Sequence, residues 1–299
     1  MPVVQAARAS NMQELSALVK GFNGKVSFIA GGTDLIIALQ QGARPGLIID
    51  ISSMDDLNFI EVGVEEVCIA AATPLSKLAQ HRGLAAKLPL LTQAAMQVGS
   101  VQIRNRATIG GNIASAVPGG DLLPALKCLG CRIEILRRDN TVTSHGFDEV
   151  VTGLGKTCLG NGDMITTIRI PLRFGRNRIS AFGKIGRRRE LTIARLNLAV
   201  LADYETDANR INDIRIVAGA IGPVPLRLRL VEKRLRGRNV NQAFVDDFLH
   251  SLIAAVDAAI SGRASQAYKR IAIMGLGLDL MQNLFEKEFS CPEKPKALT

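Results

Sequence analysis

The chain has 299 residues, 47% of them hydrophobic and 21% charged, so it can bury a large core and is long enough for two compact units. Low-complexity tracts and repeats are absent, which leaves disordered and solenoid architectures little support. A formal net charge of +10 suits a nucleic acid or an acidic partner, but 2 Tyr and no Trp leave little surface for stacking on bases. We therefore favour a basic docking face for another subunit over nucleic-acid binding.

The sequence also bears on the compartment. It contains no run of about 20 apolar residues that could span a bilayer, and its first residues lack the apolar core of a signal peptide. The five cysteines are scattered and odd in number, unlike a disulfide framework. These features predict a protein of the reducing cytoplasm with no membrane span.

The first part of the chain alternates short apolar runs with helical spacing. Polar residues start the helices, and glycine or proline interrupts them. The patterns predict a helix at 11–20, a strand at 26–30, a helix from Asp34 to Gly42, a strand at 46–51, a hairpin over 59–73 that turns near Glu65 and Glu66, and two helical patches over 74–99 split by Pro89.

The rest of the chain continues with mixed strands and helices. The patterns predict a strand-like entry to a glycine turn at 107–115, a helix at 120–130, a hairpin over 131–147 turning at Asp139 and Asn140, strands at 163–172 and 178–186, a hairpin from strands 195–205 and 210–222, and helices at 225–235, 240–260 and 265–289. Because strands and helices do not alternate strictly, the order predicts an α+β fold.

A basic, irregular stretch at 173–178 marks the predicted domain boundary. We expect a first domain at 1–175, with subdomains of about 1–55 and 56–175, a second at 176–287, and a loose tail at 288–299.

Two similar glycine turns stand far apart, IAGGTDL at 29–35 and TIGGNIA at 108–114. A backbone without Cβ atoms can approach a phosphate closely, and its N–H groups can then donate to the phosphate oxygens. Thr33 and Asn112 add side-chain hydrogen-bonding groups, and Asp34 is expected to cap a helix. Either turn alone is most simply a tight turn; the recurrence of two such turns weakens that interpretation but does not by itself identify a ligand.

Other candidate motifs are weaker. The run GLGKT at 153–157 lacks the first glycine of a Walker loop, because Val150 stands there, and GLGLDL at 275–280 suits close helix packing. Cys128 and Cys131 form a C-x-x-C with no second pair, so we expect buried structural thiols. No metal-ligand spacing, catalytic triad or pair of general acid and base is readable, so we assign no catalytic and no metal-binding residue.

The sequence resembles the FAD-binding subunit of molybdenum hydroxylases, the xanthine dehydrogenase and carbon monoxide dehydrogenase flavoprotein family. The resemblance rests on IAGGTDL and TIGGNIA together with the pair Gly120-Asp121 and the run Phe182–Lys184. The resemblance covers roughly residues 12–284. It implies a two-subdomain FAD-binding fold of the vanillyl-alcohol-oxidase (PCMH) type, followed by a smaller C-terminal α+β domain. Many relatives have Tyr at the place of Phe182.

The resemblance also implies where FAD binds. Both glycine loops would wrap the pyrophosphate, Asp121 would lie near the polar chain of the cofactor, the backbone of Ile165 would meet the flavin, and Lys184 would lie near the pyrimidine edge of the ring. A cation at that edge stabilises the negative charge of a reduced flavin. The cofactor residues implied are Ser27, Phe28, Ile29, Ala30, Gly31, Gly32, Thr33, Asp34, Thr108, Ile109, Gly110, Gly111, Asn112, Asp121, Ile165 and Lys184.

In such a family the chain would be an electron-transfer subunit of an oxidoreductase complex. A large subunit would carry molybdopterin, a small subunit would carry two [2Fe–2S] clusters, and FAD would pass electrons to NAD or another acceptor. A flavin-binding scaffold without turnover remains the alternative, and a basic nucleic-acid module is a third class. The basic run Gly186–Glu190 is either a solvated face or a surface near the cofactor or acceptor.

Overall fold

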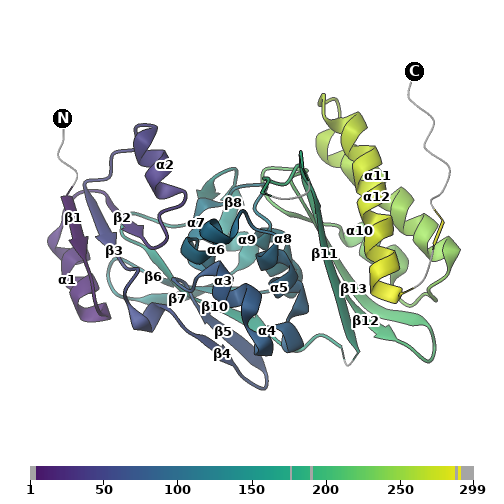
Figure 1. Ribbon diagram of the computed structural model, residues 1–299, viewed down its shortest axis with the longest axis horizontal. Coiled ribbons are helices and arrows are strands. Elements are labelled where there is room, and N and C mark those ends of the chain that lie inside the picture. Colours follow the sequence, from purple (N-terminus) through teal and green to yellow (C-terminus); the bar gives the residue numbers. More distant parts are fainter. Residues whose placement is uncertain (1–4, 176, 189–190, 287–288, 291–299) are drawn as a thin grey trace.

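The computed structural model describes residues 5–175, 177–188, 191–286 and 289–290. The described chain forms four sheets, one of them only two-stranded. The three larger sheets follow one another along the long axis of the molecule, and helices from residues 75–129 lie between the second and the third of them (Figure 1). Of the predicted tail at 288–299, only residues 289 and 290 fall within the described ranges. None of the described helices combines the length and apolarity needed to cross a bilayer.

The N-terminal sheet is parallel, with the order β1-β3-β2. The predicted helix after Asn11 is confirmed, because the Asn11 side chain accepts a hydrogen bond from the Glu14 N–H at 2.9 Å and so caps it. Strand β1 was not predicted from the sequence. The elements are β1 (Gln5–Arg8), α1 (Met12–Gly21), β2 (Val26–Ile29), α2 (Leu35–Gln40), β3 (Leu47–Asp50) and a 3-10 turn, η1 (Asp55–Leu57).

The central sheet is antiparallel, with the order β4-β5-β10-β6-β7, and both predicted hairpins in this region are confirmed. Pro89 occupies the first position of α5 and separates it from α4. Its strands are β4 (Ile60–Val62), β5 (Glu66–Ala70), β6 (Arg132–Leu136), β7 (Val142–Gly146) and β10 (Met164–Pro171). A separate two-stranded sheet consists of β8 (Val151–Gly153) and β9 (Lys156–Thr157). The helices are α3 (Leu75–Gln80), α4 (Arg82–Lys87), α5 (Pro89–Met96), α6 (Val101–Arg106), α7 (Ile109–Ser115), α8 (Leu122–Leu129) and α9 (Phe147–Val150).

The C-terminal sheet is antiparallel in the order β11-β12-β13-β14, and α11 and α12 cover its outer face (Figure 1). A Cβ on Gly277 would lie 2.7 Å from the Leu252 side chain, so the close helix packing predicted for GLGLDL holds at Gly277. The elements are β11 (Arg178–Ile185), β12 (Leu196–Glu205), β13 (Arg210–Gly219), β14 (Leu226–Arg227), α10 (Arg229–Leu235), α11 (Gln242–Ile260) and α12 (Gln266–Phe285).

Strand β11 joins the two larger cores through the alternation of its side chains. Phe182 belongs to the core beneath α3–α8, whereas its neighbour Ala181 belongs to the core beneath α11 and α12. The Phe182 N–H donates to Gln93 Oε1 of α5 at 3.0 Å. The predicted α+β class is confirmed, and the central helices pack between two sheets.

Candidate functional site

The two glycine turns meet in the folded chain. The first leaves β2 and enters α2, and Gly32 within it has φ of 74°, a left-handed conformation that favours glycine. A Cβ on Gly31 would lie 1.8 Å from the carbonyl oxygen of Arg106, the residue two before Thr108. Only glycine therefore allows the first turn to pack against the segment that enters the second.

The first turn presents a row of unpaired N–H groups. Within the described chain, the N–H groups of the five residues from Gly31 to Leu35 have no hydrogen-bond acceptor, and the next donor is Ile36, which bonds to the Gly32 carbonyl at 3.1 Å. Successive backbone N–H groups around a left-handed residue form a concavity that binds anions. Residues 31–33 are half-buried and Asp34 is exposed, so a ligand at the surface can reach these donors.

The predicted cap at Asp34 is wrong. Asp34 occupies the N-cap position of α2 in a helical conformation, and its side chain caps no N–H group. A carboxylate caps a helix from an extended N-cap residue, and this backbone is not extended. The free N–H groups of the turn are thus left for a ligand.

The predicted strand entry to the second turn is also wrong, because TIGGNIA forms helix α7. Thr108 is the extended N-cap, and its Oγ1 accepts a hydrogen bond from the Gly111 N–H at 3.1 Å. The Gly110 N–H donates to the Ala71 carbonyl at 2.8 Å, and a Cβ on Gly110 would lie 2.6 Å from the Ala71 Cβ. Gly110 therefore serves packing, and the helix cap uses the N–H group of Gly111.

Two features of the second turn are not used by contacts within the described chain. Gly111 is exposed, and a Cβ added there would meet only Thr108 Oγ1, at 3.0 Å. Asn112 Oδ1 is buried and has no hydrogen-bond partner. A buried carbonyl oxygen without a partner costs about 1–3 kcal/mol, so it marks a place where a bound group can donate.

Asp121 and Lys184 form a buried ion pair across the boundary between the central helices and β11. Lys184 Nζ lies 2.7 Å from Asp121 Oδ2, and their side chains are 6% and 5% exposed. The ammonium also donates to the carbonyl oxygens of Gln97 and, at 3.2 Å, Thr192. All three N–H bonds of Lys184 therefore have acceptors in the chain itself.

Asn197, which was not among the predicted site residues, also belongs to this cluster. Its Nδ2 donates to Asp121 Oδ1 at 3.2 Å, and the residue is fully buried in β12. Burial raises the pKa of the Asp121 carboxyl above its ordinary value, while the charge of Lys184 and the bonds from Lys184 and Asn197 act in the opposite direction. The signal in the sequence was a polar residue inside an otherwise apolar strand, LNLAVL.

Ile165 lies beside an irregularity in β10, the central strand. It is 4% exposed and pairs with Ile135, and the register of the strands shifts between Ile165 and Thr167. The carbonyl of Thr166 accepts a hydrogen bond from the Ala71 N–H at 2.8 Å. Ala71 thereby connects this bulge to the second glycine turn.

The remaining motifs stay structural. Cys128 and Cys131 are 0% and 2% exposed, as expected, and burial raises the pKa of each thiol to about 12. The run GLGKT begins at the end of β8, turns, and continues into the paired strand β9. Within the described residues, no group of three or more His, Cys, Asp and Glu side chains is arranged to hold a metal ion.

Comparison with known proteins identifies the chain by both of its parts. The model of the FAD binding domain in molybdopterin dehydrogenase matches residues 2–173, and that of the CO dehydrogenase flavoprotein C-terminal domain matches residues 181–284. The chain is 30% identical to the carbon monoxide dehydrogenase medium chain of Hydrogenophaga pseudoflava, over 86% of this chain and 88% of that protein. It is 27% identical to the glyceraldehyde dehydrogenase medium chain of Sulfolobus acidocaldarius, over 90% and 94%.

A solved structure of carbon monoxide dehydrogenase from Hydrogenophaga pseudoflava contains a chain with the same fold. Its TM-score is 0.85 at 24% identity, and the superposition covers 96% of this chain and 99% of that one. The first family model alone matches more than half of the residues. The chain therefore belongs to the molybdenum hydroxylase family as an FAD-binding oxidoreductase subunit of the xanthine and carbon monoxide dehydrogenase type, as the resemblance implied.

Proposed function

We propose that this chain holds FAD across its two glycine turns and transfers electrons from the [2Fe–2S] clusters of a small subunit to NAD or another acceptor. In this proposal a large molybdopterin subunit completes the complex. When bound, FAD supplies the redox chemistry, and the protein supplies binding, orientation and electrostatics.

The observation that carries the proposal is the row of unpaired N–H groups from Gly31 to Leu35, beside the exposed Gly111 and the unpartnered Asn112 Oδ1. A diphosphate offers the acceptor oxygens that the first turn needs. Hydroxyl groups of a nucleotide offer the donor that Asn112 Oδ1 needs. The chemistry of these groups therefore fits the proposed cofactor, with residues 27–34 and 108–112 as its two binding loops.

In the buried ion pair, Lys184 has no N–H group left to donate to the flavin. Its ammonium already donates to three oxygen atoms of the chain. We propose that Lys184 acts on the ring through its field and that Asp121 fixes its position. Ile165 would meet the ring through the irregular part of β10.

Flavin content in glycine variants tests the proposal. Gly111→Val adds a branched side chain at an exposed position whose only close neighbour is Thr108 Oγ1, so we expect the fold to persist and FAD to be excluded. The matched control is Gly275→Val in α12, where an added Cβ meets nothing within 4 Å. Each chain is saturated with FAD and desalted, and its visible absorbance and the mass of the released flavin are measured.

We expect wild-type and Gly275→Val chains to retain FAD and Gly111→Val to lose most of it. Equal retention by all three proteins would contradict the loop assignment. The electron-transfer role is tested in the assembled complex, where removal of FAD should abolish reduction of the final acceptor. Unchanged turnover without FAD would instead favour an assembly scaffold.

A further inference from the structure

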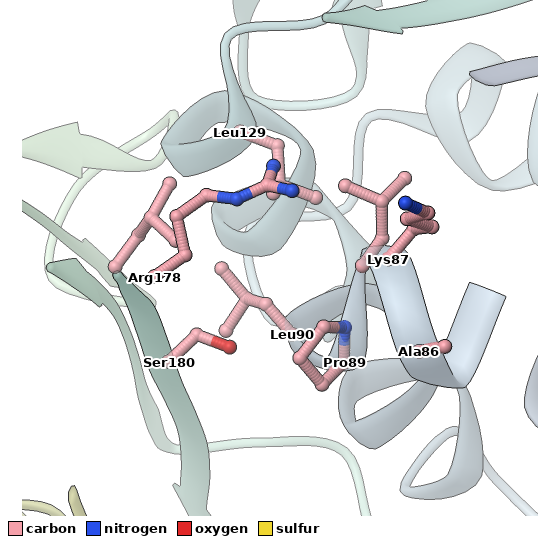
Figure 2. Close-up of a pocket in the computed structure, with 9 residues that line it drawn as sticks. Ala86, Lys87, Pro89, Leu90, Leu129, Arg178 and Ser180 are labelled. Atoms are coloured by element: carbon pink, nitrogen blue, oxygen red, sulfur yellow. The ribbon is translucent and has the colours of Figure 1, made fainter. Parts of the chain in front are cut away.

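A cavity of about 190 Å³ lies between the central helices and the C-terminal sheet, at the end of β11 remote from Lys184. Figure 2 shows its lining, which comes from the ends of α4, α5 and α8 on one side and from β11 and β12 on the other. Leucine side chains make much of the interior, including Leu90, Leu129 and Leu201. The cavity is separate from the glycine turns, none of whose residues line it.

One wall of the cavity carries a hydroxyl group with no partner. Ser180 Oγ has almost no solvent-accessible surface and makes no hydrogen bond in the described chain. In Figure 2 this oxygen points from β11 into the space beside Pro89 and Leu90. An unsatisfied buried hydroxyl is rare in native proteins, and it marks a position where a bound molecule can complete the hydrogen bonding.

Two cations flank the same space. Arg178 and Lys87 line the cavity, and within the described residues the side chain of neither has a hydrogen-bond or ion-pair partner. Arg178 and Ser180 stand two positions apart on one face of β11, so their side chains begin about 7 Å apart and can reach one ligand group. The guanidinium of Arg178 extends across the cavity toward Leu129, and Lys87 lies on the opposite side (Figure 2).

We propose that this cavity binds a small organic carboxylate whose body is apolar. The carboxylate accepts hydrogen bonds from the Ser180 hydroxyl and the Arg178 guanidinium, and the charge of Lys87 supports it. The apolar body occupies the leucine-lined interior. An apolar cavity of about 150 Å³ can hold benzene, so the observed volume accommodates one ring with a carboxylate attached.

The cavity and the Lys184 cluster share helix α5 and strand β11. Helix α5 contributes Leu90 to the cavity and bonds through Gln93 to the Phe182 N–H, and its C-cap residue Gln97 accepts from Lys184. Strand β11 runs from Arg178 at the cavity to Lys184. A ligand that draws α5 and β11 together therefore stabilises the contact on which the buried ion pair depends.

Benzoate and benzamide, which share size and shape but differ in charge, provide the test. The thermal unfolding midpoint of the full chain is followed against each compound at constant ionic strength, and Kd is measured by calorimetry. We expect a saturable rise with benzoate and none with benzamide. Arg178→Gln and Ser180→Ala should each raise Kd about tenfold, because each removes one hydrogen bond to a charged group. Arg82→Gln, a charge change on α4 outside the cavity, should leave Kd unchanged.

Ser180→Leu, which fills the cavity, should abolish the response to benzoate while the chain still unfolds cooperatively. Equal responses to benzoate and benzamide, a wild-type Kd in Arg178→Gln and Ser180→Ala, or no saturable response would each overturn the proposal. The readout does not require flavin. A chain that takes up no FAD would refute the proposed function and leave the benzoate result intact.

Discussion

Replacing Lys184 with methionine removes the cation of a buried ion pair and leaves the Asp121 carboxylate behind. Both side chains are at most 6% exposed, so water cannot take the place of the lost ammonium. Asn197 Nδ2 is then the remaining side-chain donor to the carboxylate, at 3.2 Å. Removal of one partner from a buried pair costs about 3–5 kcal/mol, and we expect the free energy of unfolding to fall by that amount near neutral pH.

The pH dependence of this loss has a definite sign. The pKa of Asp121 is already raised by burial, so its contribution to stability is present below its ordinary pKa and is lost as pH rises through the folded value. Because the charge of Lys184 lowers this pKa, Lys184→Met raises it further. The loss of stability should therefore be larger on the alkaline side of neutrality than at acidic pH, because protonation of Asp121 removes the buried charge as the pH falls.

Urea denaturation of the flavin-free chain at several pH values measures this effect. Arg210→Met is the matched control, because the Arg210–Glu205 pair is 48% and 41% exposed and should contribute less than about 1 kcal/mol. The double variant Lys184→Met with Asp121→Asn should lose less stability than the sum of its single variants, since it leaves no charge unpaired. A loss below about 1 kcal/mol that does not change with pH would refute the reasoning.

Further predictions concern the glycines of α12 and the buried thiols. Gly275→Ala should leave the free energy of unfolding unchanged or raise it by up to about 1 kcal/mol, because the added Cβ meets nothing within 4 Å and alanine favours helix. Gly277→Ala should lower it by about 1–3 kcal/mol, since the added Cβ lies 2.7 Å from the Leu252 side chain, and urea denaturation of both variants checks this contrast. Cys128 and Cys131, with thiol pKa values of about 12, should resist iodoacetamide at about pH 8 until the chain unfolds; mass spectrometry showing rapid labelling of the native protein would contradict their burial.

Local chemistry explains what the sequence predicted well. The helix after Asn11, the hairpin at Asp139 and Asn140, and the helix that contains Pro124 depend on residues a few positions apart. Turn geometry, capping and hydrophobic periodicity act over that range, so sequence patterns report them directly. The same locality allowed both glycine turns to be recognised as unusual.

Short apolar runs gave the weakest predictions. The residues before Gly110 were expected to form a strand, yet Thr108 caps a helix there. Helix and strand compete closely in a segment this short, and the contact of Gly110 with Ala71 decides between them. Asp34 likewise stands where a cap belongs, but its backbone conformation prevents capping.

The sequence by itself determined the α+β class, the first glycine turn and the burial of the C-x-x-C thiols, because each follows from composition or from neighbouring residues. Only the tertiary structure decided that the first turn packs against the segment that enters the second, that Asn197 bonds to Asp121 from 76 positions away, and that Arg178 and Lys87 flank one cavity. These features depend on how β11 packs on the central helices. No local pattern encodes such a contact, since its free energy comes from burying surfaces that chain folding brings together.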